Sequence, residues 1–294
     1  MPILFTCPYC GVQTNVSDEF AGQTGPCVKC GKTVTIPRPE SGFAPAPKSS
    51  SNTWIVLLVI GVCTIPVLLM CAGVLLPGVQ AGREAARRAN CLNNLKQIGL
   101  AMHNYHSVHG CFPPAYIPDE NGNPKHSWRV LILPYMEERA LYNRYNFDEP
   151  WDSPANQQLA PLMPKVYNCP SDALSDGVSE TSYLMVVGPG TVGEGSTPTR
   201  IVDIRDGTSN TVMVVETAGT AINWLEPEDW DTSQGDFSIN EGLGMGIESD
   251  HAGVANVLFC DGSVRSIPEW TDPEDLEALT TRDGGEEVQG WQFD

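Results

Sequence analysis

The chain has 294 residues, with 17 Lys and Arg against 36 Asp and Glu and a formal net charge of -19 at pH 7. Residues 101–294 hold 9 of the basic and 32 of the acidic residues, a balance of -23, which repels nucleic acid and anionic lipid headgroups and argues against a nucleic-acid-binding domain there. That part is long enough for one substantial core, and the 28 Gly and 24 Pro of the chain indicate many turns and a loop-rich, mainly β body.

Residues 1–36 contain two C-x2-C pairs, Cys7 with Cys10 and Cys27 with Cys30, separated by sixteen residues. In the contexts CPYCG and CVKCG, a tight turn aims two sulfurs at one ion and the glycine supplies the turn conformation. The pattern predicts a zinc ribbon with structural Zn2+, and a redox or disulfide pair is the alternative. Since about 35 residues bury little core, the metal would supply folding energy. The module has few basic residues, which favours a structural or protein-interaction role over nucleic-acid binding.

Residues 37–52 form a flexible Pro/Ser linker, PRPESGFAPAPKSSSN. An uncharged apolar run follows from Trp54 to Leu76. At 1.5 Å per helical residue the run is long enough to cross a hydrocarbon core of about 30 Å, so a transmembrane helix is predicted over residues 53–76, with a buried soluble helix as the alternative. Pro66 would kink this helix by removing one backbone hydrogen bond.

Residues 77–110 are predicted to continue the helix. Apolar and small residues recur at spacings of three and four, which gives one stripe suited to packing on a sheet: Ala85, Ala89, Leu92, Leu95, Ile98, Gly99 and Met102. A long helix of which half is in the bilayer and half packs on a β domain is the architecture of type IV pilins and pseudopilins.

Five motifs carry a resemblance to a known family. They are LLPGVQAGREAARRANCLNNLKQIGLAMHNYHSVHGCFPPA (75–115), SWRVLILPYME (127–137), NCPSD (168–172), DGTSNTVMVVE (206–216) and HAGVANVLFCDG, in which nine residues separate His251 from Asp261 and Gly262. In these residues the chain resembles a large bacterial family of prepilin-like proteins with an H-x9-DG signature, a domain of unknown function. The resemblance covers roughly residues 55–270.

The resemblance implies an α+β fold in which a zinc ribbon and one transmembrane helix lead into a pilin-like helix packed on an antiparallel sheet, with residues 111–294 as an acidic external domain. Family members usually carry a prepilin cleavage site before the apolar helix, whereas Ser-Asn-Thr-Trp stands there in this chain. Processing by prepilin peptidase and assembly into a conventional pilus are therefore not expected.

The Asp261-Gly262 pair lies between two alternating segments, VANVLFC and SVRSI, which predicts a hairpin with a type I′ turn. We interpret both residues as turn formers. His251 is either a structural hydrogen-bonding residue or a metal ligand. His103, His106 and His109 follow at three-residue steps, which drift by about 60° per pair around a helix and do not converge on a metal.

No catalytic site is predicted. A hydrolase triad could be composed of Ser182 or Ser249 with His251 and Asp261, but the chain lacks a G-x-S-x-G nucleophile elbow. It also lacks a glycine-rich phosphate loop. The protein is therefore expected not to be an enzyme.

The remaining cysteines fall into two groups. Cys63 and Cys71 lie in the apolar run and are expected to pack there. Four lie in the acidic part or just before it and allow two disulfides in three connectivities: Cys91, Cys111, Cys169 and Cys260. Because Cys91 and Cys169 both lie within motifs of the resembled family, the resemblance favours that bond, which leaves Cys111 with Cys260.

The sequence gives opposing indications of which end of the predicted span faces the cytoplasm. Four basic residues follow the run closely: Arg83, Arg87, Arg88 and Lys96. Because the positive-inside rule places such residues in the cytoplasm, it would put the C-terminal domain there. The zinc thiolates favour a reducing compartment for the N-terminus, and pilin-like proteins place the other end outside. On these two grounds we expect the N-terminus in the cytoplasm and the C-terminal domain outside.

The expected function is a membrane-anchored, pseudopilin-like structural or interaction protein of the cell envelope, with pilin-like proteins or further copies as partners. The alternative is a membrane-anchored module that binds a cation, glycan or small solute.

Overall fold

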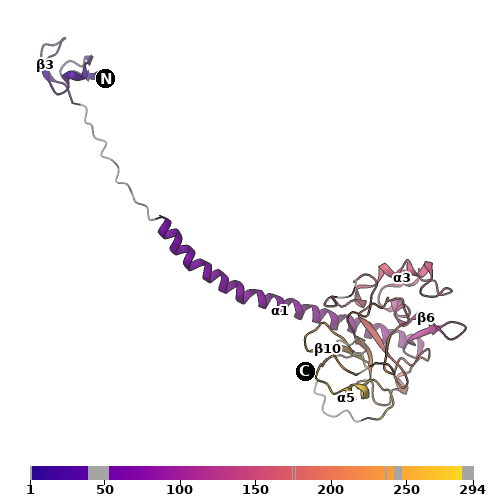
Figure 1. The fold of residues 1–294 in the computed structure, drawn as a ribbon. Helices are drawn as coiled ribbons and strands as arrows, with labels where there is room; N and C mark the ends of the chain where they lie inside the picture. Colours follow the sequence, from indigo (N-terminus) through magenta and orange to yellow (C-terminus); the bar gives the residue numbers. More distant parts are fainter. Residues whose placement is uncertain are drawn as a thin grey trace. The chain divides into compact units, whose positions relative to one another are not determined.

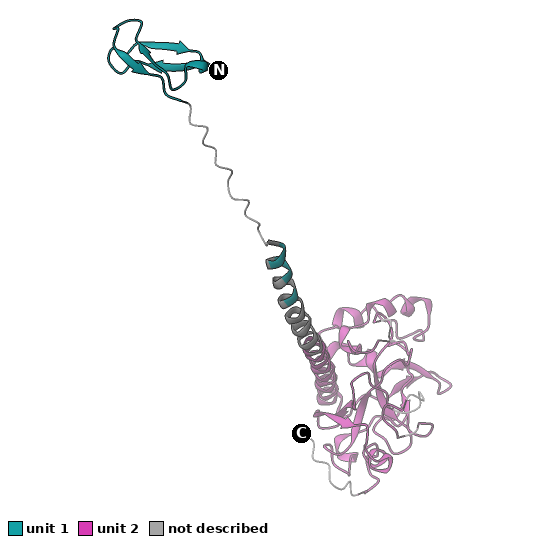
Figure 2. Ribbon diagram, turned by 60° about the vertical axis from the view of Figure 1, so that its left-hand side comes forward, with its two compact units in different colours: residues 1–70 teal, residues 71–294 magenta. Residues whose placement is uncertain are grey.

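The computed structural model describes residues 2–38, 53–173, 175, 177–235, 237–241 and 247–286, except the side chains of residues 53, 56, 59–61 and 63–77. The predicted linker 37–52 and the side chains of Cys63 and Cys71 therefore lie largely or wholly outside the described residues. The chain divides into two compact units, residues 1–70 and 71–294 (Figure 2).

The N-terminal module consists of two small antiparallel hairpins. Strand β1 (Ile3–Thr6) pairs with β2 (Gln13–Val16), and β3 (Thr24–Pro26) pairs with β4 (Thr33–Thr35). The 3-10 helix η1 (Asp18–Phe20) joins the hairpins. Each C-x2-C pair lies in the turn of one hairpin, so the two turns supply the four sulfurs.

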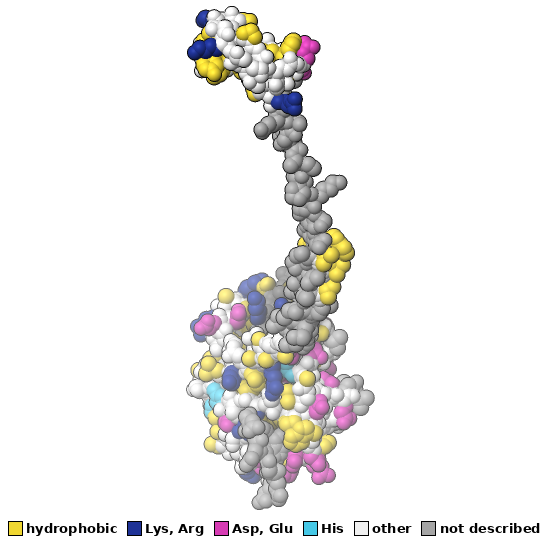
Figure 3. All heavy atoms as spheres, turned by 90° about the vertical axis from the view of Figure 1, so that its left-hand side faces the viewer, with side chains coloured by type: hydrophobic (Ala, Val, Ile, Leu, Met, Phe, Trp, Pro, Cys, Tyr) yellow, Lys and Arg dark blue, Asp and Glu magenta, His cyan; other side chains and the backbone are white. Residues whose placement is uncertain are grey.

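Helix α1 (Thr53–His109) is one element of 57 residues (Figure 1). It ends at Gly110, whose φ of 77° suits the position after a helix and whose amide donates to the His106 carbonyl at 2.8 Å. Near its start Trp54, Ile55, Leu57, Leu58 and Val62 are exposed, and these side chains form the apolar area on the drawn part of the helix in Figure 3.

The last third of α1 packs on the sheet of the C-terminal domain. Leu95, Ile98 and Met102 are fully buried, as the predicted stripe requires, whereas Ala85 and Ala89 are exposed, so the stripe begins later than its sequence pattern indicated. Gly99 permits the close approach, because a Cβ at this position would lie 2.7 Å from the Leu258 side chain.

The central sheet has the strand order β11-β10-β8-β7-β9. Its strands are β7 (Tyr183–Val187), β8 (Val212–Glu216), β9 (Trp230–Asp231), β10 (Val254–Phe259) and β11 (Val264–Pro268). All neighbours are antiparallel except β9, which runs parallel to β7. Along β10, Leu258 faces the core that contains α1, while Val257 and Phe259 face a second core that contains Leu276 and Leu279 of the α5 (Pro273–Ala278) region.

Short elements cover the α1 side of the domain. They are β5 (Tyr116–Pro118) and β6 (Pro124–Ser127), which pair, α2 (Trp128–Leu131), η2 (Leu133–Tyr135), α3 (Arg139–Tyr142), α4 (Pro154–Gln157), η3 (Ala160–Leu162), η4 (Lys165–Tyr167) and η5 (Ile201–Asp203). The C-terminal domain is thus α+β, with a five-stranded sheet between one long helix and a smaller second layer.

The predicted membrane span is wrong. In the part of the chain that the structure describes, no helix combines the length and the apolar character that a membrane crossing needs. The prediction relied on the residue types of one run, and most of the side chains of that run lie outside the described residues. The run belongs to a helix that continues into a charged segment and then into a domain core. The single-pass localisation and the transmembrane part of the expected fold class fall with it.

Candidate functional site

The four N-terminal cysteines converge as the spacing predicts. Their sulfurs all lie within 4.8 Å of one another, with 3.8 Å between Cys7 and Cys30 and 3.7 Å between Cys10 and Cys27. A regular tetrahedron with Zn–S bonds of about 2.3 Å has edges of about 3.8 Å. The geometry of the cluster is therefore compatible with a zinc site.

The two cysteine turns have the same construction. The Cys7 amide donates to the Val12 carbonyl at 2.9 Å, and the Cys27 amide donates to the Lys32 carbonyl at 2.8 Å. Gly11 and Gly31 take φ values of 70° and 67°, which residues with a side chain rarely adopt. Hydrogen bonds from the backbone of Cys30 and Lys29 lower the pKa of the Cys27 thiol and so favour the thiolate, the form that binds metal.

A second cluster lies where α1 meets the sheet, and His251 is at its centre. The His251 ring is buried; its Nδ1 lies 2.7 Å from Oε1 of Glu84, on α1, and its Nε2 lies 3.2 Å from Oε1 of Glu216, on β8. The Nε2 atom also lies 3.6 Å from Sγ of Cys169, which is bonded to Cys91. The disulfide, the histidine and the two glutamates together are called the His251 cluster below.

Hydrogen bonding sets the charge of His251. A neutral imidazole has one N–H, so both ring nitrogens donate to carboxylates only when the ring is protonated. Burial opposes that charge, but the hydrogen bonds and negative charges of Glu216 and Glu84 outweigh it and raise the pKa of His251. Bonds from His251, Arg87 and Ser171 lower the pKa of Glu84 although burial acts in the opposite direction. The cluster thus joins a helix carboxylate to a strand carboxylate through one imidazole, whose charged form both carboxylates favour.

The stability supplied by His251 is expected to depend on pH. Because its pKa is raised on folding, its contribution is complete below the unfolded value of about 6.5 and is lost as the pH rises through the folded value. Replacing His251 with Gln should therefore cost about 1–3 kcal/mol of unfolding free energy at about pH 6 and less at about pH 9. Urea unfolding of both proteins across this range measures the difference, with His109→Gln, an exposed position, as control. A cost that stays constant or grows with pH would contradict the assignment of charge.

The Asp261-Gly262 pair forms the turn of the β10–β11 hairpin, but not a type I′ turn. The Phe259 amide donates to the Ser263 carbonyl and the Gly262 amide donates to the Phe259 carbonyl, both at 2.9 Å. The loop therefore has three residues, and of the predicted pair Gly262 alone has a positive φ, 84°. A three-residue loop that ends in a left-handed glycine is a common hairpin connection, and it differs from the two-residue type I′ turn. Asp261 accepts from the Ser263 amide at 2.7 Å and so shapes the turn.

The other predicted residues do not join the cluster. Cys111 and Cys260 are both free thiols, so the second predicted disulfide is not formed. Burial raises the pKa of Cys260. His103 and His106 contact Phe112, and His109 stacks on Tyr105 with ring centroids 4.1 Å apart.

The three residues of a hydrolase triad do not assemble. The Ser182 hydroxyl donates to Asp172 at 2.9 Å, and the Ser249 hydroxyl accepts from the His251 amide. Both ring nitrogens of His251 face glutamates, and Asp261 is engaged in its turn.

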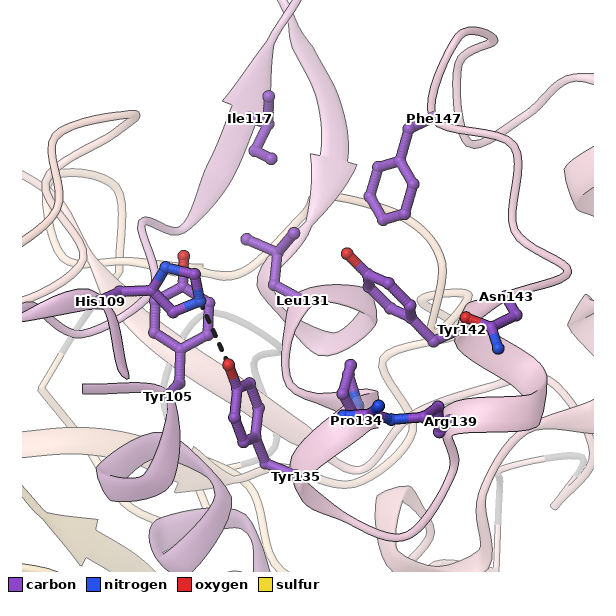
Figure 4. Close-up of a pocket in the computed structure, with 10 residues that line it drawn as sticks. All are labelled: Tyr105, His109, Ile117, Leu131, Pro134, Tyr135, Arg139, Tyr142, Asn143 and Phe147. Carbon is purple, nitrogen blue, oxygen red and sulfur yellow. Dashed lines mark hydrogen bonds between the residues drawn. The ribbon is translucent and has the colours of Figure 1, made fainter. Parts of the chain in front are cut away.

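A cavity of about 580 Å3 opens between the end of α1 and the short elements around α3 (Figure 4). In Figure 4 the rings of Tyr105, His109 and Tyr135 lie on one side, where the His109 and Tyr135 side chains hydrogen-bond at 3.2 Å, and Tyr142 and Phe147 lie on the other. Aromatic walls suit the apolar face of a sugar or a planar solute.

Three residues that organise these sites were not predicted from the sequence. Glu84 and Glu216 complete the His251 cluster, and Arg129 is fully buried beside Asp229 at 2.7 Å. Glu84 is the one acidic residue among residues 51–100, and Arg129 lies in the motif SWRVLILPYME; a charge within an apolar motif is the signal that could have identified Arg129.

Comparisons with known proteins give one match. The model of a family described as a protein of unknown function (DUF1559) matches residues 80–197 and 223–274, more than half of the chain. A search of curated proteins and a search of solved structures each found no match. The matched residues include α1 from Gln80 onward, four strands of the sheet and the residues of the His251 cluster except Glu216, which lies on β8 outside the match. The chain belongs to the DUF1559 family.

Proposed function

We propose that the protein is a non-enzymatic, pseudopilin-like interaction protein that associates with further copies of itself through the N-terminal part of α1. The likeness to prepilin-like proteins is part of this proposal. One feature supports this likeness: the last third of a long helix packs in the core of an α+β domain, as in the architecture of pseudopilins.

The exposed apolar side chains near the start of α1 carry the proposal. Trp54, Leu58 and Val62 follow at four-residue spacing and are 65%, 55% and 63% exposed, so they share one face of the helix. Burying such a side chain contributes about 1.5–3 kcal/mol. The same face on a second copy is apolar along the same length, and two such helices lying side by side bury each other.

Zinc binding by the N-terminal module belongs to the same proposal. Cys7, Cys10, Cys27 and Cys30 would hold Zn2+ as a structural ion, because four thiolates leave no coordination position open for a substrate. The role of the metal would be to keep this small module folded as a contact surface for another protein.

The oligomeric state of the full chain tests the proposal. We expect sedimentation velocity to show concentration-dependent association, and the double variant Leu58→Glu/Val62→Glu to raise the dissociation constant by about 100-fold or more, about 2.7 kcal/mol, since charges would enter an apolar interface. Leu100→Glu is the matched control, because Leu100 is 63% exposed on the same helix but lies in the part that packs on the domain; this variant should associate as the wild type does.

A full chain that stays monomeric at every concentration, or a control that dissociates like the double variant, would contradict self-association. The aromatic cavity favours a second candidate function, a module that binds a sugar or small solute. A monomeric chain would leave this candidate as the better supported one.

A further inference from the structure

We propose that the His251 cluster is a redox-dependent zinc site, in which reduction of the Cys91–Cys169 bond frees two sulfurs that bind Zn2+ together with His251 and Glu216. This inference does not depend on the self-association proposed above. All four residues are buried, and one ligand atom from each lies within 4.8 Å of those of the others. A disulfide is a poor metal ligand, whereas a thiolate is a strong one, so the redox state decides whether the site exists.

The ligand set suits zinc. Two sulfurs, one imidazole nitrogen and one carboxylate oxygen give the four ligands of a tetrahedral site, and thiolate with imidazole favours zinc over magnesium or calcium. The N-terminal cluster of the same chain shows the sulfur separation that such a site needs, 3.7–3.8 Å. The Cα atoms of Cys91 and Cys169 are 5.2 Å apart, so rotation of the two freed side chains is enough to separate their sulfurs.

The residues that hydrogen-bond the proposed ligands would orient them for a metal ion. Glu84 faces Nδ1 of His251 at 2.7 Å, which leaves Nε2 for the metal in the carboxylate–histidine–zinc arrangement. Asn256 donates to Oε2 of Glu216, and Ser266 in turn donates to Asn256 at 2.6 Å. This leaves Oε1 of Glu216, the oxygen that faces His251, as the metal ligand.

Charge explains why the reduced cluster would take up a cation. Glu84 and Glu216 already bring two carboxylates to the cluster. Two thiolates would add two buried negative charges, and buried charge without compensation is costly. A divalent cation at the centre of the four ligands removes that cost.

The reaction balances with a dithiol as reductant. The dithiol becomes a disulfide, and its two electrons and two protons convert the Cys91–Cys169 bond into two thiols. Binding of Zn2+ then releases both thiol protons and the Nε2 proton of His251 to water. Oxidation runs in reverse and expels the metal.

The test uses the full chain with Cys7, Cys10, Cys27 and Cys30 all replaced by Ser, so that the N-terminal cluster binds no metal. The variant is treated with a phosphine reductant, supplied with zinc and freed of unbound metal, and the thiols of Cys91 and Cys169 are counted by mass spectrometry. We expect no bound zinc in the oxidised form and one ion per chain in the reduced form. Cobalt in place of zinc should give a thiolate-to-cobalt absorption band in the reduced form alone.

Variants at His251 and at Asn256 distinguish this site from adventitious zinc binding by the two thiols alone. His251→Gln should weaken zinc binding at least tenfold. Asn256→Ala should weaken it by about 10–100-fold, because the Glu216 carboxylate loses the hydrogen bond that orients it. His109→Gln, at an exposed histidine outside the cluster, should leave zinc binding as in its parent. The proposal is overturned if the reduced thiols bind no zinc, if His251→Gln binds zinc as tightly as its parent, if the domain unfolds on reduction even with zinc present, or if the disulfide resists reduction in the folded protein.

Discussion

Replacing Arg129 with Met is expected to lower the free energy of unfolding by about 3–5 kcal/mol. The guanidinium is completely buried and pairs with Asp229 at 2.7 Å. It also donates to the Tyr183 carbonyl at 3.0 Å and to the Ser127 hydroxyl at 3.0 Å. Its removal takes a donor from each of these acceptors in a fully buried site.

Asp229 accounts for most of the expected loss. Its carboxylate also accepts from the Trp128 indole at 3.0 Å and the Met185 amide at 2.8 Å, and so joins α2 to strand β7. Burial raises the pKa of Asp229, while Arg129 acts in the opposite direction. Without Arg129 the pKa should rise further, and the loss of stability should shrink as the pH falls, because a protonated Asp229 is no longer an isolated buried charge.

Chemical denaturation of wild type and variants measures the effect. The control is Arg200→Met, because the Arg200–Asp203 pair has the same 2.7 Å separation but 62% and 38% exposed side chains; a surface pair contributes about 0–1 kcal/mol. Arg129→Met/Asp229→Leu should recover part of the loss, since it removes both charges together. Equal costs for Arg129→Met and Arg200→Met would show that the buried pair has no special role.

Local patterns predicted the local structure well. The C-x2-C pairs form the expected turns, and the alternation around Asp261-Gly262 forms a hairpin. The turn type was wrong because two-residue and three-residue loops share the Asp-Gly signal, and the backbone around them decides which forms. The helical stripe was correct from Leu95 onward, where α1 meets the sheet, and wrong at Ala85 and Ala89, because periodicity does not show where a partner surface begins.

The charged contacts between distant segments were not predictable from the sequence. Glu84 and His251 are 167 residues apart, and Arg129 and Asp229 are 100 residues apart. No spacing rule connects such positions, since folding of the whole sheet brings them together. The expected membrane span failed for a related reason: the apolar content of a run does not establish which surface the run meets in the folded chain.

On the zinc binding proposed above, removal of the metal is expected to unfold the N-terminal module and leave the C-terminal domain folded. The buried apolar residues of the module are Cys7, Cys27 and Val34, with Phe5, Cys10 and Cys30 packed against them. A core this small does not offset the entropy of ordering four strands. Structural zinc in small modules supplies about 10–16 kcal/mol of apparent binding energy, which exceeds what the hairpins gain by themselves.

Hydrogen exchange of the full chain with the Cys91–Cys169 bond intact measures the effect with and without a chelator, since the intact bond keeps the His251 cluster in its disulfide form. The amides of β1 to β4 should lose their protection when the chelator is added and regain it when zinc is returned, while those of β8 and β10 keep theirs. Cys27→Ser should abolish the protection of β1 to β4 even in zinc, because three sulfurs leave the tetrahedron incomplete. Cys111→Ser, at a free cysteine of the other unit, is the matched control and should behave as the wild type. Protection that persists in the chelator would mean that the two hairpins hold together without a metal, and the four cysteines would then need another explanation for their tetrahedral spacing.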